Sequence, residues 1–471
     1  MWHAGRRLRV ARRPPGRPRG GLRRRARRRA GPAQPVARSF GLRGRAPRAR
    51  AGRAHPRPVR LGRGHRARAL GLRGGARGRW PVAAGGPPQR RGGAPVDVLT
   101  VTPYYPPEGG GLERYAHEIN HRLAGRGHDV HVATFTREDP GEGKRDGVTV
   151  DRRQPAVRIG NAPVSPSFPR ELHATVQRRD PDVVVAHTPV PFPAESACLA
   201  AWRARVPFVV TYHAGRLHGS SRLLDVLAGL HRRTVEALVL EKSARLIAAS
   251  PFVREQALAD HRDRVTVVPP GVDAERFAPD GGPEGGRILF VGPLSSTYEW
   301  KGLDTLWEAF QRVRKRRPEA RLTIVGEGDR VAEFQARSSR VDGALEVLGR
   351  VSDRALVDAY QRSRVVVLPS TSEAESFGMV LAEANACGRP VVGSKIGGIP
   401  DFVDHRDNGL LARPGDPEHL ADRLIEVLDD DELAARLGRR GRQRVLADHD
   451  WGRLASRTES VLAEALRAGP P

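Results

Sequence analysis

The sequence contains only two cysteines, Cys198 and Cys387. Two thiols cannot build a disulfide framework, and they cannot supply a cysteine-based metal site. No run of about 18 apolar residues occurs, so the sequence predicts no membrane-spanning helix. Lysine is scarce as well, with five residues against 76 arginines. The scarcity of cysteine makes a reducing cytoplasm the default expectation.

Acidic residues are missing from the first 95 positions, which carry 29 arginines and no lysine. Residues 96–471 carry 52 basic and 53 acidic side chains, so the formal net charge of +28 comes entirely from the N-terminal segment. A nearly neutral remainder gives no general electrostatic footprint for DNA or RNA. We therefore expect no nucleic-acid partner for the folded part.

The segment 1–95 is rich in Arg, Gly, Pro and Ala and shows no hydrophobic period. It can bury too little apolar surface to offset its ordering entropy, so we predict a disordered tail. It also lacks the apolar core of about 7–15 residues that a cleavable signal needs. Two interpretations stay open: an Arg/Gly arm that binds nucleic acid, or a start-site artefact of GC-rich coding DNA.

Short apolar runs alternate with amphipathic segments from Val96 onward, which predicts an α/β fold with parallel sheets. A Gly/Pro-rich linker at 279–286 separates two such series. We expect a first lobe at 96–280, a second lobe at 281–448, and a terminal helix within 449–471. The predicted strands are Val96–Val101, Asp129–Thr134, Asp182–Ala186, Phe208–Tyr212, Leu246–Ala249, Val265–Val268, Ile288–Val291, Leu322–Val325, Leu345–Leu348, Val365–Leu368 and Val391–Gly393.

Two glutamates, Glu375 and Glu383, lie eight positions apart around a Phe-Gly turn. The apolar run before them predicts a buried strand, and the segment up to Cys387-Gly388 predicts a short helix. Glu375 should therefore lie in the loop at a strand's carboxyl end, and Glu383 inside the helix. Ligands of open parallel sheets bind at that edge, where a carboxylate can accept hydrogen bonds from sugar hydroxyls.

The motif around these glutamates resembles the E-x7-E signature of retaining glycosyltransferases of family 4, which have the GT-B fold. The matching residues are Pro369-Ser370, Glu375-Ser-Phe-Gly378, Glu383-Ala384 and Cys387-Gly388. The resemblance runs from about Val96 to about Ala468. It implies two Rossmann-like lobes facing a cleft, and transfer of a sugar from a nucleoside diphosphate sugar to an acceptor hydroxyl. It also implies that neither a metal nor a cofactor is needed.

The resemblance gives roles to the residues of the motif. Glu375 should bind hydroxyls of the donor sugar, and Glu383 should bind the nucleotide ribose. The helix that follows Phe377 and Gly378 begins with Met379 and Val380, and its free N–H groups should face the donor diphosphate. We count all six among the donor-binding or catalytic residues.

Two further features of the first lobe match the family. The glycine-rich turn at 106–113 resembles the loop that faces the donor diphosphate, which gives that role to Gly110 and Gly111. Glu113 falls in the first turn of a helix, where its charge suits the helix dipole. His213 ends a buried strand, and the family has a His there that contacts the donor sugar and the reacting centre.

The second lobe carries one departure from the family pattern. Pro293 stands where the family usually has Arg, whereas Lys301 is kept and should pair with phosphate. Ser295 begins the longer loop between them, and its hydroxyl would compensate only in part, because a neutral donor forms a weaker bond than a charged one. The strand ends near Gly326 and Val351 resemble segments that flank the nucleotide base. Asp273 is predicted to be a turn or capping residue.

The acceptor stays open between a glycan, a lipid-linked molecule and a small molecule. Segment 214–232 is rich in Leu and Arg, which is typical of a helix at an anionic membrane surface and also of a solvated amphipathic helix. An epimerase- or phosphorylase-like enzyme of the same architecture is an alternative function. A nucleic-acid binder acting through the Arg-rich tail is an alternative of another class.

Overall fold

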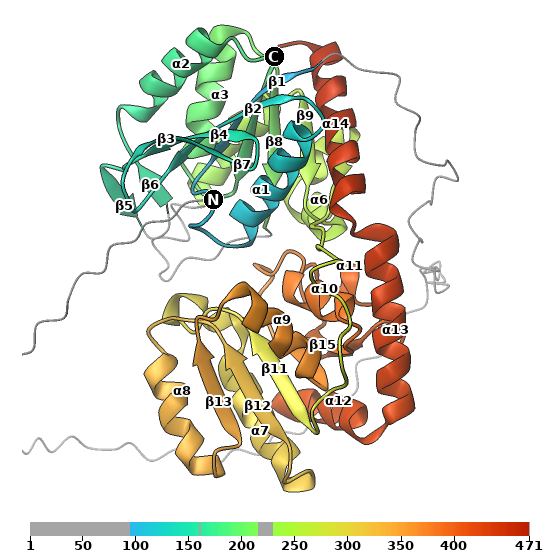
Figure 1. Cartoon of the computed structure of the whole chain (residues 1–471). Helices are drawn as coiled ribbons and strands as arrows, with labels where there is room; N and C mark the ends of the chain where they lie inside the picture. The colour runs from blue at the N-terminus through green and yellow to red at the C-terminus, as the bar shows by residue number, and fades with distance from the viewer. Residues whose placement is uncertain (1–94, 160–161, 215–228, 471) are drawn as a thin grey trace, which may run out of the picture. The chain divides into compact units, whose positions relative to one another are not determined.

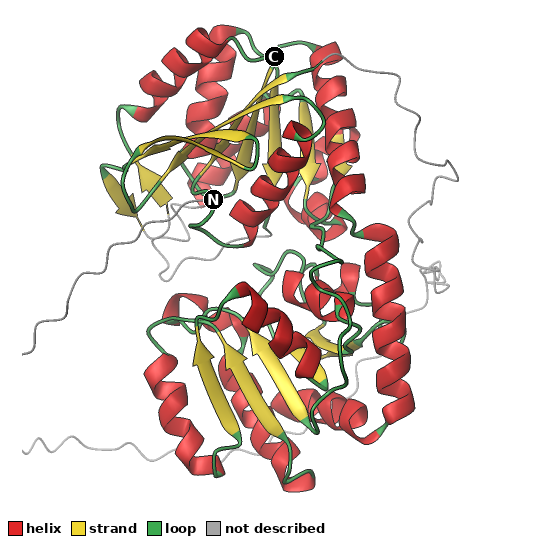
Figure 2. Cartoon of the chain, in the orientation of Figure 1, coloured by secondary structure: helices red, strands yellow, loops and turns green. Residues whose placement is uncertain are grey.

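The computed structural model describes residues 95–159, 162–214 and 229–470, which belong to one compact unit, Pro88–Pro471 (Figure 1). The predicted disordered tail lies outside the described residues except for its last position. Most of segment 214–232 lies outside them too. Within the described part, strands alternate with helices along both halves of the chain (Figure 2).

The first sheet has eight strands in the order β10-β9-β8-β7-β1-β2-β4-β3. All neighbours run parallel except β3 and β4. A separate antiparallel pair, β5 (Val157–Ile159) and β6 (Ala162–Val164), extends from this lobe. The strands of the sheet are β1 (Asp97–Thr102), β2 (Asp129–Phe135), β3 (Gly141–Arg145), β4 (Val148–Arg153), β7 (Val183–Thr188), β8 (Phe208–Tyr212), β9 (Arg245–Ala248) and β10 (Val265–Val267).

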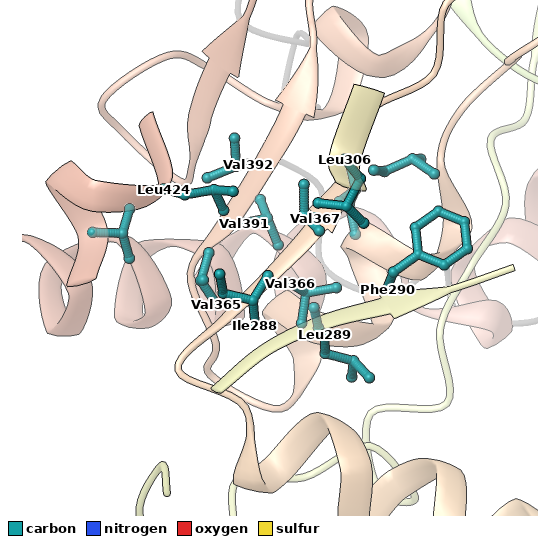
Figure 3. Close-up of a cluster of buried hydrophobic side chains, with 14 of the residues drawn as sticks. Ile288, Leu289, Phe290, Leu306, Val365, Val366, Val367, Val391, Val392 and Leu424 are labelled. Carbon is teal, nitrogen blue, oxygen red and sulfur yellow. The ribbon is translucent and has the colours of Figure 1, made fainter. Parts of the chain in front are cut away.

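The second sheet has six parallel strands in the order β13-β12-β11-β14-β15-β16. Its strands are β11 (Arg287–Val291), β12 (Arg321–Val325), β13 (Leu345–Gly349), β14 (Val365–Leu368), β15 (Val391–Ser394) and β16 (Leu410–Ala412). Their side chains are almost continuously apolar because helices cover both faces of a parallel sheet. Val365, Val366 and Val367 of β14 belong there to one buried apolar cluster with Phe290 of β11 and Leu306 (Figure 3).

The helices connect the strands and cover the sheets. In the first lobe they are α1 (Gly111–Ala124), α2 (Phe168–Arg179), α3 (Pro193–Ala204), α5 (Ala237–Glu241) and α6 (Pro251–Ala257), with the turns η1 (Arg232–Glu236) and η2 (Ala259–Arg264). After the linker they are α7 (Leu303–Arg316), α8 (Val331–Ser338), α9 (Asp353–Arg362), α10 (Met379–Ala386), α11 (Ile399–Phe402), α12 (Pro417–Asp429), α13 (Asp431–Asp448) and α14 (Trp451–Ala468), with the turns η3 (Ser296–Lys301) and η4 (Ser339–Val341).

The last helix, α14, packs against α1 and against β7, β8 and β9 of the first sheet. Trp451 at its start is fully buried, and its ring meets Tyr115 of α1 edge-on at 5.6 Å. A Cβ atom on Gly271 would lie 2.6 Å from the indole, so only glycine fits beside it. The C-terminal helix therefore completes the core of the first lobe.

The structure confirms the predicted α/β class with parallel sheets. β8 and β14 have the predicted bounds, α14 lies within the predicted segment 449–471, and the other predicted strands differ by one or two residues at their ends. Asp273 is a turn residue, one of the two predicted roles, and its Oδ1 accepts the N–H of Arg276 at 3.0 Å. The described strands that the sequence did not predict are β3, β4, β5, β6 and β16.

Candidate active site

Glu375 lies in the loop between β14 and α10, as the sequence predicts, and is 6% exposed. Its Oε2 accepts hydrogen bonds from Nζ of Lys301 at 2.7 Å and from Oγ of Ser370 at 3.0 Å. Lys301 ends η3, which follows β11. Because β11 and β14 are neighbours in the sheet, their carboxyl ends bring these two loops together.

The ammonium group of Lys301 is held on a second side by an aromatic ring. Its Nζ lies 4.5 Å from the ring centroid of Trp300, within the range of a cation–π interaction. The carbonyl of Trp300 in turn accepts the N–H of Thr371 at 2.7 Å, which ties η3 to the loop of Glu375. The positive charge therefore has a fixed place at this edge of the sheet.

The turn at Gly397 and Gly398, which precedes α11, supports the Glu375 loop. The N–H of Gly398 donates to the carbonyl of Glu375 at 2.8 Å. A Cβ atom on Gly398 would lie 1.8 Å from the carbonyl oxygen of Ser376, so the backbones approach closely only because this residue is glycine. The position of Glu375 thus depends on a distant turn.

Glu383 lies within α10, and its two oxygens have partners in different lobes, Arg114 of α1 in the first and Tyr360 of α9 in the second. Oε1 accepts from a guanidinium nitrogen of Arg114 at 2.7 Å, and Oε2 accepts from the hydroxyl of Tyr360 at 2.7 Å. Burial, and then the charge of Glu383, raise the pKa of Tyr360 well above its ordinary value, so the hydroxyl remains a donor. A carboxylate has about four acceptor sites, so Glu383 keeps acceptor capacity beyond these two hydrogen bonds.

The glycine-rich turn lies against the start of α10. Glu113 caps α1, because its Oε2 accepts the N–H of Gly110 at 2.6 Å. Gly109 is the residue with a left-handed backbone, at a φ of 105°. A Cβ atom on Gly111 would lie 3.3 Å from Sδ of Met379, so the N-terminal ends of the two helices meet at these residues.

His213, which follows β8, forms a pair with His187, the last residue but one of the neighbouring strand β7. Nε2 of His213 lies 2.7 Å from Nδ1 of His187. The ring of Tyr115 packs edge-on against the ring of His213. One nitrogen must donate and the other accept, which couples the two tautomers. Burial lowers the pKa of His187 to about 3, and burial followed by the neighbouring His187 holds the pKa of His213 well below its ordinary range. Both rings are therefore neutral near pH 7.

Comparison with known proteins identifies the family. Residues 109–276 match the model described as Glycosyltransferase Family 4, and residues 273–444 match Glycosyl transferases group 1. The glycogen synthase of Mycobacterium tuberculosis is 31% identical over 402 residues, which cover 79% of this chain and 95% of that protein. The chain belongs to this family of glycosyltransferases.

Two further likenesses agree with the family. The D-inositol 3-phosphate glycosyltransferase of Xylanimonas cellulosilytica is 31% identical over 408 residues, covering 77% of this chain and 94% of that protein. The crystal structure of Anabaena Alr3699/HepE with UDP and glucose has a TM-score of 0.63 at 19% identity, covering 78% and 99% of the two chains. The latter shows that this glycosyltransferase has the GT-B fold that the sequence predicted.

The other predicted donor residues of the glycosyltransferase have structural neighbours of their own. Oγ of Ser295 accepts the N–H of Thr297 at 3.3 Å and caps η3. A Cβ atom on Gly326 would lie 1.8 Å from the carbonyl oxygen of Gly292, so packing of β12 against β11 explains this glycine. The remaining four surround the carboxyl edge of the second sheet: Val351 after β13, buried Phe377, left-handed Gly378 at the N-cap of α10, and Val380 in its first turn.

Two residues that contact predicted site residues, Arg114 and His187, were not predicted from the sequence. Arg114 resembles any polar residue of a surface helix, and its partner Glu383 is 269 positions away. His187 carries the same signal as His213, a histidine at the carboxyl end of a buried strand. Across the described ranges no hydrogen bond joins the histidine pair, the Lys301–Glu375 pair and the Arg114–Glu383 pair to one another, so the site has three separate polar clusters.

In the residues that the structure describes, no group of three or more His, Cys, Asp or Glu side chains could hold a metal ion. No helix among them is long and apolar enough to cross a membrane. Cys198 and Cys387 are free and buried.

Proposed function

We propose that this glycosyltransferase moves a hexose from a nucleoside diphosphate sugar to an acceptor hydroxyl, with retention at the anomeric carbon and without a metal. The observation that carries the proposal is the contact between Lys301 and Glu375 at the carboxyl ends of β11 and β14. It joins a cation suited to phosphate with a carboxylate suited to sugar hydroxyls at one edge of the second sheet. In the HepE structure the ligands are UDP and glucose, which are ligands of this chemical class.

We propose that the second lobe, 281–448, binds the donor and that the first lobe, 96–280, binds the acceptor. Glu375 binds the sugar hydroxyls, Glu383 the ribose, and Lys301 the diphosphate, helped by the first N–H groups of α10. The residues around Gly326 and Val351 flank the base. Gly110 and Gly111 close over the diphosphate from the other lobe.

We propose a same-face displacement as the chemical step, because no described side chain is an evident covalent nucleophile. The bond between the anomeric carbon and the diphosphate oxygen breaks, and its electron pair leaves with the diphosphate. The acceptor oxygen bonds to the carbon from the same face and passes its proton to the leaving oxygen. Lys301 stabilises the charge that develops there, and neutral His213 donates or accepts one hydrogen bond at the sugar.

We also propose a cytoplasmic location with peripheral contact at the inner face of the membrane. Among the described residues, five of nine exposed large hydrophobic side chains lie on α3 or between 230 and 238, and these two segments are in contact. Exposed arginines accompany them, which suits an anionic bilayer. The hydrophobic residues are Leu199, Trp202, Leu230, Val235 and Leu238, and the arginines are Arg203, Arg205, Arg232 and Arg233.

A panel of nucleoside diphosphate sugars tests the function. The true donor should raise the unfolding midpoint, since a ligand that binds only the folded chain stabilises it. With that donor labelled, the anomeric configuration of the product distinguishes retention from inversion. Activity after treatment with EDTA tests metal independence. An altered donor with no transfer product would instead indicate an epimerase, and no stabilisation by any donor would contradict the proposal.

A further inference from the structure

Arg114 lies in the first turn of α1, three residues after Gly111, and contacts the second lobe through Glu383. Its side chain is 30% exposed, and its guanidinium carbon lies 5.6 Å from the ring centroid of Phe277. Of its five N–H groups, one donates to another described residue. Most of the guanidinium's donors therefore remain available to a ligand.

Each of the two motif glutamates, Glu375 and Glu383, is paired with one cation. Lys301 pairs with Glu375, and Arg114 pairs with Glu383. A nucleoside diphosphate brings two ionised phosphoryl groups, and more charge develops when the sugar leaves. Pro293, at the end of β11, supplies no charge. If Lys301 were the sole cation, the leaving diphosphate would meet a site with an excess of carboxylates.

Arg114 is within reach of the proposed diphosphate position. Gly111 and Met379 bring the N-terminal ends of α1 and α10 together. Arg114 is three residues along α1 from that contact, and Glu383 is four residues along α10. At a rise of about 1.5 Å per residue, both side chains start roughly 4.5–6 Å from the two helix ends. An arginine side chain is long enough to cover that distance.

We propose that Arg114 is a second donor-binding cation, which pairs with Glu383 in the free chain and donates to the donor's diphosphate in the complex. The inference rests on the proposed function and deepens it. Ribose hydroxyls would replace part of the guanidinium's contact with Glu383. The planar guanidinium suits bidentate phosphate binding, whereas lysine acts as a point charge. Since Arg114 belongs to the first lobe, the donor would also link the two lobes.

The competing explanation is that Arg114 only bridges α1 and α10. The affinities of a variant for a nucleoside and for the matching nucleoside diphosphate distinguish this structural bridge from a phosphate contact. A bridge that merely holds Glu383 in place would affect the ribose, and therefore both ligands, equally. A phosphate contact would affect the diphosphate alone.

The test uses the full chain and calorimetric titration with UDP, ADP or GDP, whichever the wild type binds, and with the matching nucleoside. Arg114→Gln should weaken diphosphate binding about 10- to 100-fold, the range of a charge-assisted hydrogen bond, and should change nucleoside binding less than about 3-fold. Arg114→Lys keeps the charge and should lose less. Arg122→Gln is the matched control, because Arg122 is on the same helix and pairs with Glu118.

Each outcome has a distinct meaning. Equal losses for nucleoside and diphosphate, or an unchanged diphosphate affinity, would overturn the role of Arg114 and leave the proposed function standing. A wild type that binds no nucleoside diphosphate would overturn the proposed function and this inference with it. If Arg114→Gln does not fold, Arg114→Lys is the deciding variant, since it keeps a cation beside Glu383. A loss of affinity for the diphosphate but not for the nucleoside would support the inference. Wild-type affinity for the diphosphate would contradict it.

Discussion

Nζ of Lys301 lies 2.7 Å from Oε2 of Glu375, although the residues are 74 positions apart in the sequence. Their pairing follows from the adjacency of β11 and β14. In the free chain the ammonium and the carboxylate neutralise each other. A donor that fits the proposal would separate their tasks, because its hydroxyls would bind Glu375 and its phosphates would bind Lys301.

Replacing Glu375 with Gln should reduce turnover by orders of magnitude. The amide has nearly the same shape but no charge, and it cannot accept from Lys301, Ser370 and the sugar at once. Initial rates with a labelled donor measure the effect. Glu373→Gln is the matched control, since Glu373 is an exposed residue of the same loop. Wild-type rates for Glu375→Gln would contradict its assigned role.

Replacing Lys301 with Ala should weaken binding of the nucleoside diphosphate by roughly 1–3 kcal/mol, because a charge-assisted hydrogen bond to phosphate is lost. Calorimetric titration measures the change. Lys315→Ala, at the exposed end of α7, removes an equal charge away from the site and should leave the affinity unchanged. Unchanged affinity in Lys301→Ala would refute the phosphate contact.

The sequence was sufficient for most of the fold because buried parallel strands are almost purely apolar. β8 and β14 have no polar face, so their bounds follow from the apolar run and the turn residues beside it. By contrast, β3 is Gly-Glu-Gly-Lys-Arg and lies exposed at the sheet edge, so neither composition nor alternation marks it as a strand. β16 has three residues, which is too short for any period to appear.

The site was predictable only where a residue carries a local signal. Glu375 and Lys301 follow apolar strands, and the order of strands in the sheet then brings them together. Arg114 faces Glu383 only because the helix ends at Gly111 and Met379 meet, and no local pattern encodes that contact. The contact between Arg114 of the first lobe and Glu383 of the second is therefore visible only in the structure.

The pair of buried histidines should make stability depend on pH. The folded chain keeps His187 neutral down to about pH 3, whereas the unfolded chain protonates it near pH 6.5. The unfolded state thus binds more protons between these values. The free energy of unfolding should fall as the pH decreases through this window, by at most about 1.4 kcal/mol per pH unit for each histidine, and should be fully recovered above pH 6.5.

Urea unfolding of the wild type and His187→Gln at pH 7.5 and pH 5.0 checks this dependence. The variant removes one of the two rings, so its loss of stability between the two values should be smaller. Buried His131 and His449 also have pKa values lowered to about 4 by burial, so the difference between the two proteins is the informative quantity. Equal losses in both proteins would show that His187 does not contribute.

Removing residues 1–95 should leave donor affinity unchanged. All of the proposed site residues lie within the described part of the compact unit Pro88–Pro471. The truncated and full-length chains can be compared by titration with the same donor at two salt concentrations. A large loss of affinity in the truncated chain would give the Arg-rich segment a role in donor binding.

Replacing Gly398 with Ala should lower turnover without touching any proposed catalytic side chain. A Cβ atom there would lie 1.8 Å from the carbonyl oxygen of Ser376, so the loop or the turn must move. The N–H of Gly398 donates to the backbone carbonyl of Glu375. Movement of this backbone should therefore displace the side-chain carboxylate of Glu375 from Lys301.

Turnover and the unfolding midpoint of Gly398→Ala should be measured together. Gly282→Ala is the matched control, since a Cβ atom on this linker glycine would meet nothing within 4 Å. We expect Gly398→Ala to lose at least 10-fold in turnover, because a displacement of about 1 Å in a positioning group can cost about 100-fold. If it keeps wild-type turnover, the placement of Glu375 does not depend on the turn, and the sugar contact must tolerate movement of the loop.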